Sequence, residues 1–215
     1  MPRRATRLLS ACFVVLQAVT SVAALAAVDD DFRAASAAYR SGDMNTAIKT
    51  LLRGSDAGHV PSMLLLAYIY EQASFDSQAV AMYQKAVAAG STDGEVGLAG
   101  MLAAGKGVPR NTSEALRLYE SASAKGNPTA ISALAQAYIS GSLGLVAGAR
   151  DDAKALEAIR RAAGQGYAPA AEALARAYSQ GDYGLTPDAA EAARWRDKGA
   201  TGAARAQPPA SKASK

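Results

Sequence analysis

The residues that could do chemistry are few and scattered along this sequence. Its 215 residues include one histidine, His59, and one cysteine, Cys12. A lone histidine with no second histidine or cysteine beside it cannot complete a zinc site, so His59 is interpreted as a surface or capping residue. The acidic run Asp29–Asp31 is interpreted as stabilising the start of the first helix. No serine stands in a nucleophile elbow. The sequence therefore predicts no catalytic, cofactor or metal site and a protein that is not an enzyme.

The charge of the chain argues against a nucleic-acid partner. The formal net charge is +4, but three arginines, Arg3, Arg4 and Arg7, lie in the first seven residues. Without them, 20 basic residues face 19 acidic ones. A protein that binds nucleic acid should carry a basic face or stripe, and a nearly balanced chain predicts none.

The first 26 residues have the pattern of a secretory signal peptide. The three arginines form its charged region, residues 8–22 its apolar region, and Ala24-Leu25-Ala26 a small-x-small cleavage site. Cleavage is expected after Ala26, which predicts a periplasmic or secreted protein. The apolar run is too short and too close to this site to favour a retained membrane helix, so the mature chain is not expected to be an integral membrane protein.

One other interpretation of this segment remains open. Leu9-Ser10-Ala11-Cys12 resembles a lipobox, which would make Cys12 a lipid-anchored N-terminus. Most of the apolar stretch follows Cys12 instead of preceding it, so this option is the weaker one. If the signal is removed, the mature chain contains no cysteine and must fold without disulfides.

A repeat in the sequence predicts the helices that carry these residues. A bulky residue is followed seven positions later by glycine five times: Leu51/Gly58, Tyr83/Gly90, Tyr119/Gly126, Ile159/Gly166 and Trp195/Gly202. Successive glycines are 32, 36, 40 and 36 residues apart. A period in this range, with helical patterns inside each unit, predicts a helical solenoid.

Each unit is expected to contain two helices. The first carries a buried stripe with spacings of 4, 8 and 11 residues, clearest at Ala130-Leu134-Tyr138-Gly141. Aligned with it, Val60, Leu64, Leu65 and Tyr68 are predicted to be the stripe of the second unit, and Tyr39, Tyr68, Tyr138 and Tyr178 to be core residues. Five residues are expected to start the second helices as N-caps: Asp43, Asp76, Asn111, Asp151 and Thr186. The solenoid is predicted over residues 29–202, and residues 203–215 as a disordered tail.

The segment Gly105-Lys106-Gly107-Val108-Pro109, followed by Glu114 to Asn127, closely resembles the Sel1-like repeat (SLR), a relative of the tetratricopeptide repeat (TPR). The resemblance extends over residues 31–202. It implies an all-α fold, a right-handed superhelical solenoid of about five antiparallel helix pairs. The last unit departs from the pattern, because Glu191 stands where four other units have alanine.

The resemblance also implies a function. SLR proteins generally supply scaffolds and adaptors in signalling, in cell-envelope complexes and in exopolysaccharide secretion. Some secreted members, with a disulfide in every repeat, have been linked to β-lactam binding or hydrolysis. This chain lacks those cysteines, so an envelope hydrolase or β-lactam-interacting protein is the alternative.

A groove along the first helices is the expected binding surface for a protein or peptide partner. Its residues are those that face away from the predicted stripe: Arg33, Arg40, Leu66, Ile69, Ser132, Gln136, Ile139, Glu172 and Arg176. Leu66 and Ile69 are predicted to be exposed apolar anchors, because exposed apolar patches tend to mark partners. The open alternative is that the second unit packs with a rotated face that buries both.

Overall fold

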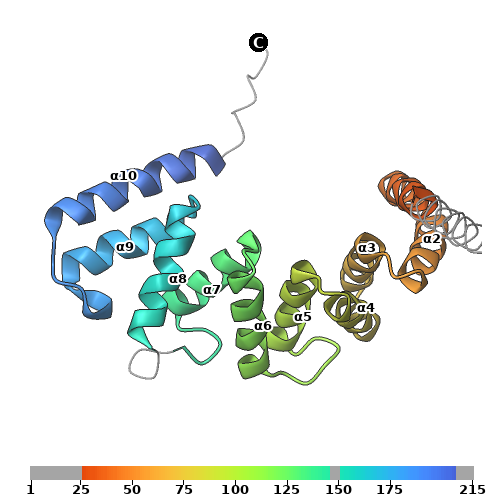
Figure 1. The fold of residues 1–215 in the computed structure, drawn as a ribbon, viewed down its shortest axis with the longest axis horizontal. Coiled ribbons are helices and arrows are strands. Elements are labelled where there is room, and N and C mark those ends of the chain that lie inside the picture. Colours follow the sequence, from red (N-terminus) through yellow and green to blue (C-terminus); the bar gives the residue numbers. More distant parts are fainter. Residues whose placement is uncertain (1–25, 146–150, 207–215) are drawn as a thin grey trace, which may run out of the picture. The chain divides into compact units, whose positions relative to one another are not determined.

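A computed structural model describes residues 26–145 and 151–206, and these residues form helices and no strands (Figure 1). The helices follow one another as antiparallel pairs, which confirms the all-α, SLR/TPR-like solenoid. The chain divides after Ala89 into two compact units, each described by itself below. The predicted signal peptide up to residue 25 and the predicted tail from residue 207 lie outside the described residues.

The first unit contains two helix pairs. Residues 26–41 form a helix that is followed by α2, Met44–Asp56; the second pair is α3, Val60–Gln72, and α4, Asp76–Ala88. Helix α3 packs on both α2 and α4. The first helix reaches α3 through an edge-to-face contact between Phe32 and His59, with ring centroids 5.3 Å apart.

The second unit contains three helix pairs. They are α5 and α6, Thr92–Ala104 and Thr112–Ala124; α7 and α8, Pro128–Ser140 and Asp152–Gly164; and α9 and α10, Ala168–Gln180 and Ala189–Ala206. A short 3₁₀ turn, η1 (Asp182–Gly184), joins the last two helices. Each helix packs on its neighbours in sequence, and α7 also contacts α5 and α9.

Four of the five repeated glycines end a second helix in the left-handed conformation. Gly58, Gly90, Gly126 and Gly166 have φ between +83° and +91°. A Cβ atom added to any of the four would meet no atom within 4 Å, so glycine is required there by the backbone angle.

The fifth glycine, Gly202, does something different. It lies inside α10, and a Cβ added to it would be 2.9 Å from the carbonyl oxygen of Gly166. Gly202 therefore does not end its helix as the other four glycines do. This glycine is needed for close approach of two backbones.

Three of the five predicted N-caps are confirmed. The side chains of Asp43, Asn111 and Asp151 accept hydrogen bonds from the first free backbone N–H groups of α2, α6 and α8. The prediction for Asp76 was wrong, because Asp76 is the first residue of α4 and its side chain caps nothing. The prediction for Thr186 was also wrong. Asp188 caps α10, accepting from the backbone N–H groups of Ala190 and Glu191 at 2.9 and 3.0 Å.

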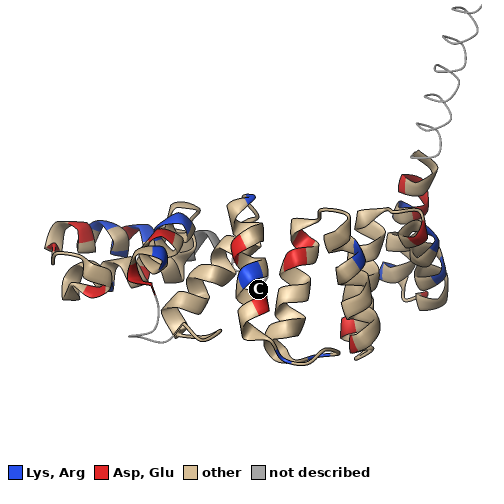
Figure 2. Cartoon of the chain, turned by 60° about the horizontal axis from the view of Figure 1, so that its bottom comes forward, with Lys and Arg blue, Asp and Glu red and all other residues tan. Residues whose placement is uncertain are grey.

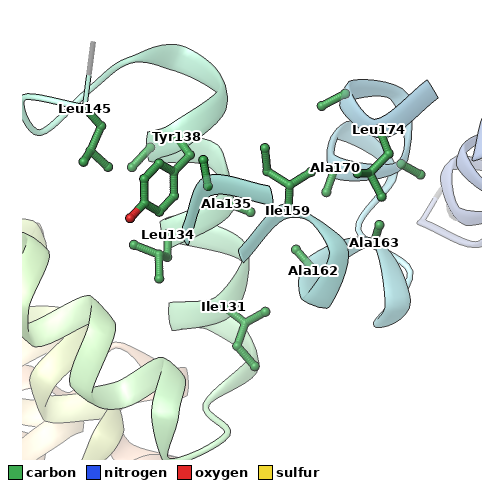
Figure 3. Packing of buried hydrophobic residues seen from close by; sticks show 14 residues of the cluster. Ile131, Leu134, Ala135, Tyr138, Leu145, Ile159, Ala162, Ala163, Ala170 and Leu174 are labelled. Atoms are coloured by element: carbon green, nitrogen blue, oxygen red, sulfur yellow. The ribbon is translucent and has the colours of Figure 1, made fainter. Parts of the chain in front are cut away.

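Small residues let the helices approach closely, and larger ones fill the layers between pairs. Ala47, Ala79, Ala115 and Ala155, the alanines of the repeat, have no exposed surface. In the second unit the core is centred on Ile159 of α8, which lies between residues of α7 and α9 such as Ala135 and Ala170 (Figure 3).

The last helix pair still packs on its unit, but in α10 Ala192, and not the preceding residue, is buried. Ala192 of α10 is 1% exposed, while Glu191 forms an ion pair with Arg194 and is partly exposed. Trp195 packs partly buried against the core of the second unit. Helix α10 continues to Ala206, so residues 203–206, which were predicted to belong to the tail, are helical.

Candidate partner-binding surfaces

The first helices of the pairs present the same positions to solvent. Counted from the first residue of each helix, α3, α5, α7 and α9 all bury the residues two, six and seven positions further on. The residues four, eight and eleven positions further on are more exposed to solvent than this buried set. This outward set in α7 is Ser132, Gln136 and Ile139, and in α9 it is Glu172, Arg176 and Ser179. The predicted groove residues of these two helices are therefore in the outward set.

The prediction that Leu66 and Ile69 are exposed anchors was wrong. Leu66 has no exposed surface and Ile69 is 5% exposed. The reason is a two-residue error of register in α3. The stripe begins four residues after the repeated glycine at Gly94, Ala130 and Ala170, and the same spacing from Gly58 gives Ser62, not Val60. Both side chains are buried, as the open alternative expected, but α3 buries the same positions as α5, α7 and α9, so its face is not rotated.

Tyr68 occupies the outward position that had been assigned to Leu66. Its side chain is 46% exposed, so the expectation of a core residue was wrong for Tyr68. The ring stands edge-to-face against Tyr39 of the preceding helix, with centroids 6.4 Å apart. Arg33 and Arg40, both predicted groove residues, are exposed on that helix, two turns apart. We call Arg33, Tyr39, Arg40 and Tyr68 the tyrosine–arginine surface.

The side of α3 next to Tyr68 is fixed to α4. The hydroxyl of Tyr83 donates a hydrogen bond to the Glu71 carboxylate at 3.1 Å. Burial, followed by the negative charge of Glu71, raises the pKa of the Tyr83 phenol far above its ordinary value. The phenol therefore stays protonated and keeps α3 in place on α4.

In the second unit, the outward face of α7 contacts the start of α9. The hydroxyl of Tyr167 donates to the side-chain oxygen of Gln136 at 2.9 Å. Gln136 is exposed, while Ser132 and Ile139 on the same face are partly buried. Of these three, Gln136 is the residue best placed to meet a partner.

The outward residues of α9 line a cavity of about 330 Å³ beside α10. Glu172 and Arg176 line it from α9, together with Ser179. Arg196 lines it from α10 and donates to the Ser179 hydroxyl at 3.0 Å. The sequence pattern missed Arg196, because only first helices were searched for binding residues.

A second cavity, of about 270 Å³, lies over α7 between α6 and α8. Its floor includes Leu134 and Tyr138, and charged residues of both signs surround it. Burial, and then Glu120 and other nearby carboxylates, raise the pKa of the Tyr138 phenol. Sequence analysis did not find this site, since its residues come from three helices.

His59 is the N-cap residue of α3, as the prediction of a capping residue allows, but its side chain makes no capping hydrogen bond and is not on the surface. Its side chain is 10% exposed; Nδ1 lies 2.8 Å from the Ser62 hydroxyl and Nε2 lies 3.1 Å from the Asp29 carboxylate. A serine, a histidine and an aspartate in contact could suggest nucleophilic catalysis. Ser62 is only 1% exposed and lies directly under Gly54, so its oxygen is closed to a substrate. The arrangement joins the first helix to α3.

The described part of the chain holds no cluster of three or more histidine, cysteine or acidic residues fit for a metal ion. In the same part, no helix combines the length and the apolar character needed to cross a membrane. Figure 2 shows basic and acidic residues interspersed on the described helices of both units.

Known structures identify the fold. The chain is 28% identical to a protective antigen of uropathogenic Escherichia coli that displays an SLR fold (TM-score 0.63, 73% of this chain and 33% of that one). A Sel1 repeat protein from Oxalobacter formigenes is 24% identical (TM-score 0.67, 81% of this chain and 73% of that one). A third likeness is to a Sel1 repeat protein from Klebsiella pneumoniae, 23% identical (TM-score 0.52, 83% and 90%). No protein-family model and no curated protein matches the sequence. The protein has the SLR fold.

Proposed function

We propose that this protein is an exported, non-enzymatic scaffold that binds a protein or peptide partner through the outward faces of its first helices. Its place of action would be the cell envelope, in assembly or in exopolysaccharide secretion. The SLR fold supports this proposal, because helical repeat proteins offer extended surfaces for partners.

The exposed Tyr68 side chain is the observation that carries the proposal. Large aromatic residues that are held rigid at a surface contribute much of the binding energy at protein interfaces. Tyr68 is 46% exposed and is supported from one side by Tyr39. Arg40 on the neighbouring helix adds positive charge, while Arg33 forms an ion pair with Asp30 at 2.9 Å, so we expect an acidic or aromatic segment of the partner to bind at the tyrosine–arginine surface.

Replacing Tyr68 by serine is expected to weaken partner binding by about 30-fold, the usual effect of losing a binding hot spot. The measurement is co-purification of partners with tagged protein from envelope extracts, followed by titration of the captured partner. Phe75→Ser is the matched control, because Phe75 is 53% exposed but lies between α3 and α4, off the first-helix face.

Circular dichroism must show that both variants keep their helices. If Tyr68→Ser captures the partner as well as the unaltered protein does, the tyrosine–arginine surface is not the binding site. A loss that is equal in Phe75→Ser would also contradict the proposal, because it would indicate a general effect of removing exposed aromatic surface.

We propose export because of the sequence that precedes the described part of the chain. Arg3, Arg4 and Arg7, the apolar region and Ala24-Leu25-Ala26 give the order of a signal peptide. Mass spectrometry of the protein from the host cell is expected to find a chain that begins at Ala27. A mass that retains Met1 would contradict cleavage, and a lipid on Cys12 would replace this proposal by a membrane-anchored form.

A further inference from the structure

The cavity between α6 and α8 is built by side chains at helical spacing on three rigid helices. Glu120 and Ser123 come from α6, Leu134 and Tyr138 from α7, and Lys154, Glu157 and Arg161 from α8. Residues three or four positions apart in a helix lie on one face, so each helix turns a single face to the cavity. The volume of about 270 Å³ lies just below the roughly 300–1,000 Å³ usual for small-molecule pockets. A compact ligand is therefore indicated.

Four charged side chains line this small space and do not neutralise one another. Glu120 and Glu157 are acidic, and Lys154 and Arg161 are basic. In the described part of the chain, ion pairs form elsewhere, as between Lys125 and Glu95, but none joins any of these four. Arg161 makes one long hydrogen bond, to the Ser123 hydroxyl at 3.5 Å. Both kinds of charge therefore remain available to a ligand.

The floor of the cavity carries a polar group without a partner. Tyr138 is 3% exposed, lines the cavity, and its hydroxyl forms no hydrogen bond within residues 26–145 and 151–206. Figure 3 shows its ring next to Leu134, with the oxygen at the end away from Ile159. The hydroxyl oxygen is not closed off from solvent, since Glu95 Oε2 is the one buried side-chain polar atom without a partner in the described residues, so the Tyr138 oxygen is open to water or a ligand.

We propose that this cavity binds a small zwitterion, an α-amino acid or a short peptide with free ends. The ligand's ammonium group has three donors and suits the carboxylates of Glu120 and Glu157 together with the Tyr138 oxygen. Its carboxylate accepts from Arg161, whose fork of N–H donors fits two carboxylate oxygens. The aliphatic body lies on Leu134. This small-molecule site is separate from the tyrosine–arginine surface and goes beyond the scaffold function.

The balance of charge in the lining distinguishes this ligand from simpler ions. An anion alone would leave two carboxylates unpaired, and a cation alone would leave Lys154 and Arg161 unpaired. Lys154, Glu157 and Arg161 are exposed in the free protein, so a ligand that shields them from water without pairing them would leave charged groups desolvated at a cost. A molecule that carries both charges on a short apolar frame satisfies both pairs at once.

The test is an NMR titration of the ¹⁵N-labelled protein with alanyl-alanine. We expect saturable shifts confined to amides of α6, α7 and α8, with a Kd on the order of 1 mM or tighter for so small a ligand. N-acetyl-alanyl-alanine lacks the ammonium group and alanyl-alanine amide lacks the carboxylate. Each blocked form is expected to bind at least about tenfold more weakly, because a charge-assisted hydrogen bond is lost.

Two variants test the assigned roles. Arg161→Gln is expected to weaken alanyl-alanine binding about tenfold, and Arg160→Gln, the neighbouring arginine that donates to Tyr178 instead, should leave it unchanged. Tyr138→Phe keeps the ring in the core and removes only the hydroxyl, so weaker binding without loss of folding would support the site. Absence of saturable shifts would overturn the proposal. Equal binding of the blocked dipeptides, or equal effects of the two arginine variants, would overturn it as well.

Discussion

Replacement of Ile159 by alanine is expected to lower the free energy of unfolding by about 2–5 kcal/mol. Ile159 has no exposed surface and fills the layer of the second unit between α7 and α9 (Figure 3). Truncation removes apolar contacts on both sides and leaves a cavity, because the rigid helices close around it only in part. Urea unfolding followed by circular dichroism measures the change.

Leu156 provides the matched control for Ile159. It lies one turn earlier in α8 and packs against the same core while partly exposed. Leu156→Ala is expected to cost less than half as much, since less surface leaves the core. Equal costs for the two variants would show that burial between pairs does not govern the stability of this unit.

The second large effect is expected at Gly54 in α2. A Cβ atom there would lie 2.3 Å from the oxygen and 2.9 Å from the Cβ of Ser62 in α3. Gly54→Ala must therefore push α2 away from α3, and we expect a loss of about 1–3 kcal/mol in the free energy of unfolding. The hydrogen bond between His59 and Ser62 should be disturbed at the same time.

Two further variants make this prediction decisive. Gly164→Ala at the end of α8 adds a methyl group where no atom lies within 4 Å, so stability should stay equal or rise slightly. Ser62→Gly removes both atoms that the new methyl group would meet, so it should partly restore the Gly54→Ala protein. If Gly54→Ala is as stable as Gly164→Ala, the close contact between α2 and α3 is not as described.

The repeat pattern predicted the fold because it consists of packing residues. The alanines at 47, 79, 115 and 155 and the glycines that end the second helices have local roles that repeat in every pair. The spacing of these residues therefore predicts where the helices begin and end. The pattern failed at the last helix, where Gly202 approaches another backbone and Asp188, not Thr186, provides the cap.

The candidate sites were harder to predict, for two physical reasons. A helix turns by about 100° per residue, so the two-residue shift in α3 exchanged Leu66 for Tyr68 at the surface. The cavity under α6 and α8 depends on contacts between residues more than 30 positions apart, such as Ser123 and Arg161. The spacing of residues within one helix does not predict a contact between residues of two different helices. In α7 and α9, where the register was right, the predicted residues lie at outward positions.

Within each unit, the packing of each helix on its neighbours in sequence has a consequence for how the protein is made. A ribosome adds about 5–20 residues per second, so one pair of about 36 residues emerges within a few seconds. Helices and short loops form in microseconds, far ahead of synthesis. Within a unit, each hairpin can thus pack on the previous one while the rest of the chain is still being translated, and nascent chains in which Gly90 has left the ribosome should already resist a protease up to α4.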